Sequence, residues 1–350
     1  MSLSKVIIST GCTSGLGHAT LSLLLKQSPA PPSEPLILIV GSRSIPPLHP
    51  LPHSKNHSIH YIKLDLTDLQ SVHDFAHEAK LLVPEGVGGS GIDVVFLNAG
   101  VWKQDEVEVE GTGWGEEAIV NHFSQHYLLQ VLSPLLTLPR PTLPRTRIVM
   151  TTSSLQNSVR SLDSPTLADI LNPLSSLSPR PTPKERYSAS KFVQMTAASG
   201  WSKMLEGMVD VVAVSPGFIP TTGLNRESSV WGRFFLKWIL YWAPFCSSVE
   251  QGSSCPSSVF ITSPPIAFHP LPAKTHVVSL STGAKGLLHA FTVPIPLRED
   301  VPSQPSTLPT ITYLNNTGSP LAPSPLIAIG GKELVKEWSP SREEIEKWID

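Results

Sequence analysis

The chain has 350 residues, of which 40% are hydrophobic and 15% are charged, and its formal net charge at pH 7 is -2. This length and apolar content predict a globular protein with a sizeable core. The nearly neutral charge gives no electrostatic basis for binding nucleic acid or a strongly acidic partner, so we expect neither.

The spacing of the cysteines and the N-terminal sequence bear on the cellular compartment of the protein. Cys12, Cys246 and Cys255 form no C-x-x-C pair and no zinc-binding spacing, so we expect a reducing compartment and no metal site. Residues 1–5 run directly into the apolar residues 6–8, so we expect no signal peptide. The predicted location is cytoplasmic, with the cytosolic face of an internal membrane as an alternative.

Short apolar runs alternate with stretches of helical composition in the first two thirds of the chain. Continuous apolar strands separated by helices are typical of a parallel sheet covered on both faces. The sequence therefore predicts an α/β doubly wound, Rossmann-type fold. The predicted strands are residues 5–9, 36–40, 60–64, 92–97, 147–152 and 209–214, and the predicted helices are 16–27, 71–82 and 114–132.

The 35 prolines are concentrated in a few segments that cannot continue a helix or a central strand, and we interpret these as loop insertions. We expect residues 1–255 to form a single domain, with residues 256–350 as a C-terminal extension packed on it. In that extension, 277–280 and 311–314 are predicted as strand-like. Residues 333–338 and 341–349 are predicted as a helix pair, because S-R-E-E at 341–344 matches a capped helix start.

Tyr187 and Lys191 stand four residues apart in a helical stretch, so they project from one face, one turn apart. A tyrosine has an unperturbed pKa of about 10, and a neighbouring ammonium lowers that pKa. The pair is therefore a candidate general acid or base. The alternative is an ordinary surface pair of tyrosine and lysine.

Residues 10–17, T-G-C-T-S-G-L-G, lie between the first predicted strand and the first predicted helix. Glycines at this position permit a tight turn and let the backbone approach a pyrophosphate at the helix N-terminus. The spacing is G-x-x-x-G-x-G, which differs from the common G-x-G-x-x-G. The position between strand and helix favours dinucleotide binding over a purely structural turn.

Together with these motifs, the chain resembles the short-chain dehydrogenase/reductase family over residues 5–222, including its retinol-dehydrogenase-like and 3-ketosteroid-reductase-like members. The seven matching motifs follow the family order: residues 10–17, Asp65-Leu66, Asn98-Ala99-Gly100, Asn121, the serine in T-T-S-S, Tyr187 with Lys191, and Pro216-Gly217.

The resemblance implies a catalytic set of Asn121, Ser153, Tyr187 and Lys191. Ser154 is the alternative to Ser153, because adjacent residues in an extended segment point in opposite directions. Asn121 is implied to hold a water that relays protons to Lys191. The implied cofactor contacts are Gly11, Thr13, Ser14, Gly15, Leu16, Gly17, Arg43, Asp65, Leu66, Asn98, Ala99, Gly100, Tyr187, Lys191, Pro216, Gly217, Ile219 and Thr221.

Some of these positions have a structural alternative. Asp65 is implied to contact the adenine ring, yet a carboxylate at a strand end could equally cap the following turn. The resemblance implies a partly structural role for Asn98, which braces the central sheet, and the alternative is an ordinary turn asparagine. Asn121 could be a solvent-facing asparagine. Residues 162–183 form an insertion between Ser153 and Tyr187, and we expect it to shape one wall of the substrate mouth.

Cofactor choice depends on residues 41–44, G-S-R-S, after the second predicted strand. A carboxylate here would bind the ribose 2′-hydroxyl of NAD, and none is present. Arg43 offers a planar fork suited to a 2′-phosphate. The sequence therefore predicts NADP(H) rather than NAD(H).

Residues 231–245, W-G-R-F-F-L-K-W-I-L-Y-W-A-P-F, are apolar around most of a helical circumference and too short to span a bilayer. One interpretation is a buried core helix. The other is a substrate lid over about 226–250 that also contacts a membrane interface, which favours a lipophilic small-molecule substrate.

The predicted function is NADP(H)-dependent hydride transfer between a nicotinamide and a carbonyl or secondary alcohol, with Tyr187 as general acid/base. Two alternatives are a non-catalytic NADP-binding regulator on the same fold and a serine hydrolase, the latter lacking a G-x-S-x-G motif. The oligomeric state is open, and a homodimer is compatible with the sequence.

Overall fold

The computed structural model describes most of the chain, including every strand of the predicted sheet. The described residues are 5–27, 35–52, 56–84, 91–138, 144–160, 162, 167–217, 219, 278–292, 311–317 and 319–349. The segment 231–245 and Thr221 lie outside them. None of the helices in these ranges has the length and apolar character needed to cross a membrane.

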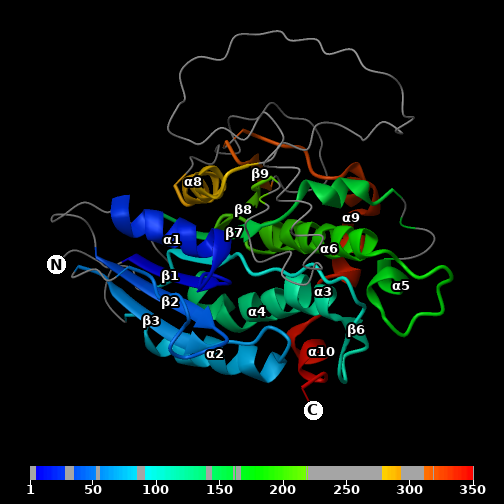
Figure 1. The fold of residues 1–350 in the computed structure, drawn as a ribbon, viewed down its shortest axis with the longest axis horizontal. Coiled ribbons are helices and arrows are strands. Elements are labelled where there is room, and N and C mark those ends of the chain that lie inside the picture. The colour runs from blue at the N-terminus through cyan, green and yellow to red at the C-terminus, as the bar shows by residue number, and fades with distance from the viewer. Residues whose placement is uncertain are drawn as a thin grey trace, which may run out of the picture.

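A seven-stranded sheet with only parallel pairings forms the centre of the molecule (Figure 1). Its spatial order is β3-β2-β1-β4-β7-β8-β9, so the chain reverses its direction of travel across the sheet between β1 and β4. Ligands of such sheets bind outside the carboxyl ends of the strands at this reversal. The strands are β1 (Lys5–Thr10), β2 (Leu36–Ser42), β3 (Ser58–Lys63), β4 (Val94–Leu97), β7 (Thr146–Thr151), β8 (Val209–Ser215) and β9 (Thr312–Asn315).

Helices cover both faces of the sheet, which confirms the doubly wound α/β prediction (Figure 1). On one face, α1 (Gly15–Gln27) and α8 (Leu280–Ala290) pack against the strands. On the other face lie α2 (Leu69–Leu81), α4 (Ser124–Leu136) and α6 (Pro183–Met204). The strands are buried on both sides, which explains their nearly continuous apolar sequences.

The start of α6 is fixed by local sequence. The side chain of Thr182 accepts a hydrogen bond from the N–H of Glu185, and the carboxylate of Glu185 accepts one from the N–H of Thr182. Pro183 occupies the first turn, where its missing N–H is not needed. This capping box fixes where the helix begins, and therefore where Tyr187 falls on it.

The predicted helix over 114–132 was wrong at its start. Trp114–Gly115 is instead β6, paired antiparallel with β5 (Glu108–Val109), because Gly113 turns the chain at a φ of 72°. Helical structure begins at α3 (Glu116–Ala118) and passes through a π-helical turn, η1 (Ile119–Phe123), before α4. Such turns widen a helix locally and often occur at functional sites.

The C-terminal predictions had mixed outcomes. The strand over 311–314 is confirmed as β9, and the capped start at Ser341 is confirmed by its bond from the N–H of Glu344. The strand over 277–280 was wrong, because Ser279 caps α8 and Leu280 begins it. The helix expected over 333–338 is the second segment of α9 (Pro325–Glu337), which is kinked at Gly331 with a φ of 51°, and α10 (Arg342–Glu346) follows it. The short α5 (Leu167–Leu171) was not predicted.

The described end of the C-terminal extension belongs to the core of the protein. Trp338 is 1% exposed and packs against Trp114 and Phe123, with ring centroids 5.7 and 6.0 Å away. Trp348 packs edge-on against Phe123 at 5.1 Å. The Tyr127 hydroxyl donates to Glu346 at 3.1 Å, which ties α10 to α4.

We expect Trp338→Ala to lower the free energy of unfolding by roughly 3–5 kcal/mol, the usual loss for truncating a large buried aromatic side chain. Urea denaturation followed by circular dichroism measures this. Leu174→Ala is the matched control, because Leu174 is 68% exposed and its truncation should change stability by less than about 0.5 kcal/mol. Similar small losses for both variants would contradict the packing of this segment into the core.

Candidate active site

The loop after β1 lies against the residues that follow β4, and two glycines make this approach possible. Gly11 has a φ of 65°, and a Cβ on it would lie 2.6 Å from the Cα of Ala99. A Cβ on Gly17 would lie 2.4 Å from the amide nitrogen of Asn98. The glycines of this motif are therefore required by steric contact as well as by conformation.

Asn98 braces the centre of the sheet. Its Nδ2 donates to the carbonyl of Gly11 at 2.8 Å, and its Oδ1 accepts from the Thr151 hydroxyl at 3.1 Å. The side chain thus joins the ends of β1, β4 and β7. These contacts match the bracing role that the resemblance implies for Asn98.

The glycine-rich loop fits a dinucleotide pyrophosphate. Helix α1 begins at Gly15, so Thr13 and Ser14 precede its N-terminus and Leu16 packs into the core beneath it. The first N–H groups of a helix have no intrahelical acceptor and favour an anion. Arg43 follows β2 directly and is exposed at the same edge of the sheet.

Tyr187 and Lys191 lie on α6 with both side chains buried, at 5% and 3% exposure. Lys191 Nζ donates to the Thr151 carbonyl at 3.1 Å and to Gln194 Oε1 at 3.2 Å, and lies 5.9 Å from the centroid of the Tyr187 ring. These contacts rule out the alternative of an exposed surface pair.

The structure places Ser153, rather than Ser154, against the tyrosine. The side chain of Ser153 interacts with that of Tyr187 and acts to lower its pKa. Ser153 also caps the short 3-10 helix η2 (Ser154–Ser158), accepting from the N–H of Leu155 at 3.2 Å. Ser154 is exposed, and its N–H donates to the Ser215 hydroxyl at 3.0 Å.

The pKa values differ from the sequence-based expectation. Burial raises the pKa of Tyr187, and the interaction with Ser153 only partly opposes this. Burial lowers the pKa of Lys191 to about 7. The predicted lowering of the tyrosine pKa by a neighbouring ammonium is therefore wrong for the chain without cofactor. Burial disfavours the charged form of both groups.

Asn121 lies in the π-helical turn and is fully buried, so the solvent-facing alternative is wrong. Its Oδ1 accepts from the Val101 N–H at 2.7 Å, and its Nδ2 donates to the Val101 carbonyl at 2.9 Å and to the Ser190 hydroxyl at 2.9 Å. A Cβ on Gly100 would lie 3.3 Å from Asn121 Oδ1 and 3.4 Å from Lys191 Nζ. Asn121 thus fixes the loop after β4 beside Lys191.

The remaining predicted contacts lie around the same edge. Asp65 Oδ1 accepts from the N–H and the hydroxyl of Thr67, at 3.0 and 2.8 Å, which is the turn-capping arrangement. Leu66 is buried. Pro216 and Gly217, with a φ of 80°, follow β8, and Ile219 is buried against Gly283 of α8.

Two residues of this region were missed by the sequence analysis. The indole of Trp102 stacks on the Tyr187 ring, with centroids 4.8 Å apart and planes 9° apart. Arg186, the residue before Tyr187, is buried and hydrogen-bonded to the loop that contains Trp102. An aromatic residue two positions after N-A-G was the only sequence signal available for Trp102.

These observations describe an α/β protein with a glycine-rich loop after its first strand and a site containing a buried tyrosine, a buried lysine and a partly buried serine. The family model for short chain dehydrogenases matches residues 5–231. A short-chain dehydrogenase/reductase from Pestalotiopsis microspora is 30% identical over 98% of this chain and 98% of its own length. The chain belongs to the short-chain dehydrogenase/reductase family and is an oxidoreductase of that family.

Solved structures share the fold at low sequence identity. An alcohol dehydrogenase from the archaeon Thermococcus sibiricus, complexed with 5-hydroxy-NADP, aligns at a TM-score of 0.51 and 17% identity, covering 91% of this chain and 100% of that chain. The carbonyl reductase Sniffer of Drosophila melanogaster aligns at 0.52 and 16%, with the same coverages of 91% and 100%. These alignments support the Rossmann-type architecture.

The pKa of Lys191 predicts a pH-dependent stability in the chain without cofactor. A lysine in the unfolded chain has a pKa of about 10.4. Between that value and the folded value of about 7, the unfolded chain binds a proton that the folded chain does not. The free energy of unfolding should therefore rise with pH across this window, by about 1.4 kcal/mol per pH unit.

Urea denaturation of the wild type and of Lys191→Met at pH 7, 8 and 9 measures this contribution. We expect the stability of the wild type relative to the variant to increase with each step. Lys203→Met, which removes an exposed lysine from the same helix, is the control and should show no such trend. A wild-type advantage that is constant or falls with pH would contradict the lowered pKa of Lys191.

Proposed function

We propose that this protein catalyses NADP(H)-dependent hydride transfer between the nicotinamide and a carbonyl or secondary alcohol group of a lipophilic small molecule. The observation that best supports this reaction is the buried Tyr187, whose side chain interacts with that of Ser153 and which lies one helical turn from Lys191. A hydrolase would need an activated serine nucleophile, whereas here the serine interacts with a phenol.

In the reductive direction, the substrate carbonyl oxygen would lie between the hydroxyls of Tyr187 and Ser153. NADPH, when bound, supplies the hydride that adds to the carbonyl carbon. Tyr187 then gives its proton to the developing alkoxide, so the C=O group becomes CH–OH. An ordinary tyrosine, with a pKa of about 10, is already protonated near neutral pH. Burial raises the pKa of Tyr187 further in the chain without cofactor.

In this proposal, Lys191 contacts the cofactor and Asn121 takes part in proton transfer to Lys191. The ammonium of Lys191 donates to the Thr151 carbonyl and to Gln194, and in this proposal it also binds the nicotinamide ribose. Binding of a polar cofactor there would replace part of the lost solvation and favour the charged ammonium. Asn121 holds the neighbouring loop, and a water relay through Asn121 is part of this proposal.

Arg43 supports NADP(H) over NAD(H). It stands at the end of β2 in G-S-R-S, where no carboxylate competes for the ribose. A guanidinium offers paired donors to a 2′-phosphate. The lipophilic substrate class rests on the apolar residues 231–245, as do a lid and a membrane contact for that segment.

Tyr187→Phe should lower the turnover number at least about 100-fold, because it removes the proton donor and leaves the ring in place. The affinity for NADPH, measured by fluorescence titration, should be unchanged. Tyr127→Phe is the control, since that buried hydroxyl bonds Glu346 on α10 and should be dispensable for turnover. Substantial turnover by Tyr187→Phe with a carbonyl substrate would remove Tyr187 from the role of general acid.

Arg43→Asp should change the ratio of kcat/KM for NADPH over NADH at least about tenfold in favour of NADH. The change replaces charge-assisted hydrogen bonds to the phosphate by repulsion. Lys203→Asp alters the net charge equally at an exposed site at the end of α6 and should leave the ratio unchanged. An unchanged ratio in Arg43→Asp would show that Arg43 does not contact the 2′-phosphate.

A further inference from the structure

The indole of Trp102 is part of the immediate surroundings of the proposed general acid. It stacks flat on one face of the Tyr187 ring, at 4.8 Å and 9°. Trp102 is only half-buried, so part of the indole stays accessible beside the phenol. Its Nε1–H is buried and meets no acceptor within the described ranges. Buried donors without an acceptor are uncommon in folded proteins, and an oxygen atom of a bound ligand would supply the missing acceptor.

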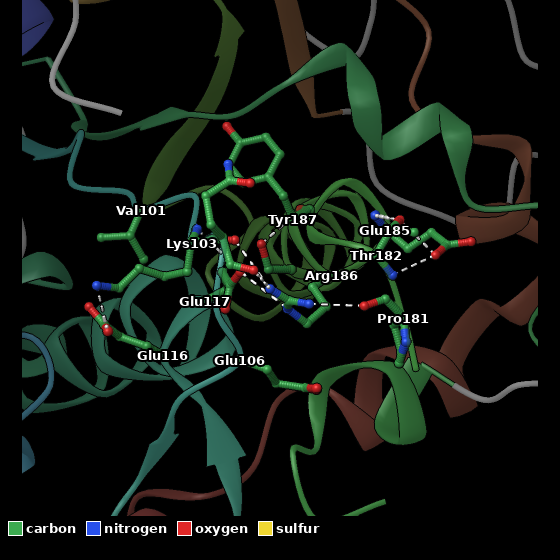
Figure 2. A network of polar contacts seen from close by, with 12 residues as sticks. Val101, Lys103, Glu106, Glu116, Glu117, Pro181, Thr182, Glu185, Arg186 and Tyr187 are labelled. Atoms are coloured by element: carbon green, nitrogen blue, oxygen red, sulfur yellow. Dashed lines mark hydrogen bonds and ion pairs between the residues drawn. The ribbon is translucent and has the colours of Figure 1, made fainter. Parts of the chain in front are cut away.

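The position of Trp102 is fixed from both sides along the chain. On one side, Val101 makes two hydrogen bonds to Asn121 through its N–H and carbonyl. On the other side, the guanidinium of Arg186 donates to the carbonyls of Lys103 and Gln104, at 3.2 and 3.0 Å (Figure 2). Trp102 therefore lies between two anchored neighbours.

Arg186 also reaches the end of the insertion that precedes α6. Its guanidinium donates to the carbonyl of Pro181 at 2.9 Å, on the side opposite the loop after β4 (Figure 2). One side chain thus connects three segments: the loop with Trp102, the insertion, and the helix turn with Tyr187. The planar fork of arginine suits this role, because its donors have fixed relative directions.

Glu117, on α3, also contacts Arg186 and the loop that contains Trp102. Its Oε1 lies 3.5 Å from Arg186 Nε and accepts from the N–H of Lys103 at 3.3 Å. Both charged side chains are buried, and burial raises the pKa of Glu117 while Arg186 opposes that shift. A buried ion pair adds little net stability because desolvation offsets the attraction. Its evident effect here is to fix the geometry of the loop.

We propose that Trp102 is a specificity-determining residue whose indole contacts the substrate beside the Tyr187 hydroxyl, and that Arg186 is the positioning residue that holds it there. This inference rests on the proposed reaction and adds the substrate class. A large, flat and partly accessible aromatic surface favours stacking of a planar group. The preferred substrates are therefore carbonyl compounds with an aromatic or conjugated ring next to the C=O group.

The first test compares a planar and a saturated substrate in the full-length enzyme with NADPH. The probes are naphthyl methyl ketone and decahydronaphthyl methyl ketone, which differ mainly in flatness. Trp102→Ala should lower kcat/KM for the planar ketone by roughly tenfold, mostly through KM, and change the saturated ketone much less. Trp102→Phe should recover part of the loss, because it restores an aromatic face.

The second test addresses Arg186. Arg186→Lys keeps the charge and loses the fork, so it should reproduce the Trp102→Ala loss for the planar ketone. Its crystal structure should show the indole displaced from the Tyr187 ring. Arg180→Lys is the matched control: Arg180 bonds Glu106 at 2.6 Å and several carbonyls, including those of Asn172 and Pro173, yet is exposed and has no bond to residues 101–104. If Arg186→Lys does not fold, Glu117→Gln has the same expected result.

The outcomes separate this inference from the proposed reaction. If the wild type oxidises NADPH with neither ketone nor any other carbonyl compound, the proposed reaction fails, and the role of Trp102 fails with it. If the wild type is active and Trp102→Ala affects both ketones equally, only the role of Trp102 is overturned. If the two rings stay stacked in Arg186→Lys, Arg186 is not the positioning residue.

Discussion

The hydrogen bonds of Asn98 are the interaction on which the site depends. Parallel strands end at one edge of their sheet, and at that edge the amide joins the Gly11 carbonyl to the Thr151 hydroxyl. The same Thr151 accepts from Lys191 through its carbonyl, so the position of the lysine follows from the register of β4 and β7. Residues far apart in the sequence thus meet because three strands end at the same edge. Glycine is needed at positions 11 and 17, where the loop after β1 contacts Ala99 and Asn98.

Burial governs the electrostatics of this site more than charge pairing does. The phenol of Tyr187 and the ammonium of Lys191 are both shifted toward their neutral forms, because both are removed from water. A neutral phenol holds its proton until an alkoxide develops close by, which suits the general acid of a carbonyl reduction. In the same region, Arg186 and Glu117 stay together as a buried pair whose hydrogen bonds hold the neighbouring loop.

Residues before α6 and the C-terminal helices make contacts that help to fix the site. The insertion before α6 ends at Pro181, which Arg186 binds, and at the capping box that starts the helix. The C-terminal helices pack Trp338 against Phe123 in the π-helical turn, two residues after Asn121. Packing far from the reacting groups therefore helps to fix the loop and the helix that present them.

The α/β architecture, the glycine-rich loop and the proximity of Tyr187 to Lys191 could all be predicted from the amino-acid sequence alone. These features are encoded locally, in apolar runs of strand length, in residues that tolerate positive φ, and in helical spacing. The contact of Ser153 with Tyr187 and the stacking of Trp102 on the phenol follow from tertiary structure alone. The tertiary structure also reversed the expected pKa shift of Tyr187. Side-chain direction and burial depend on residues that are distant in the sequence, and no local pattern specifies them.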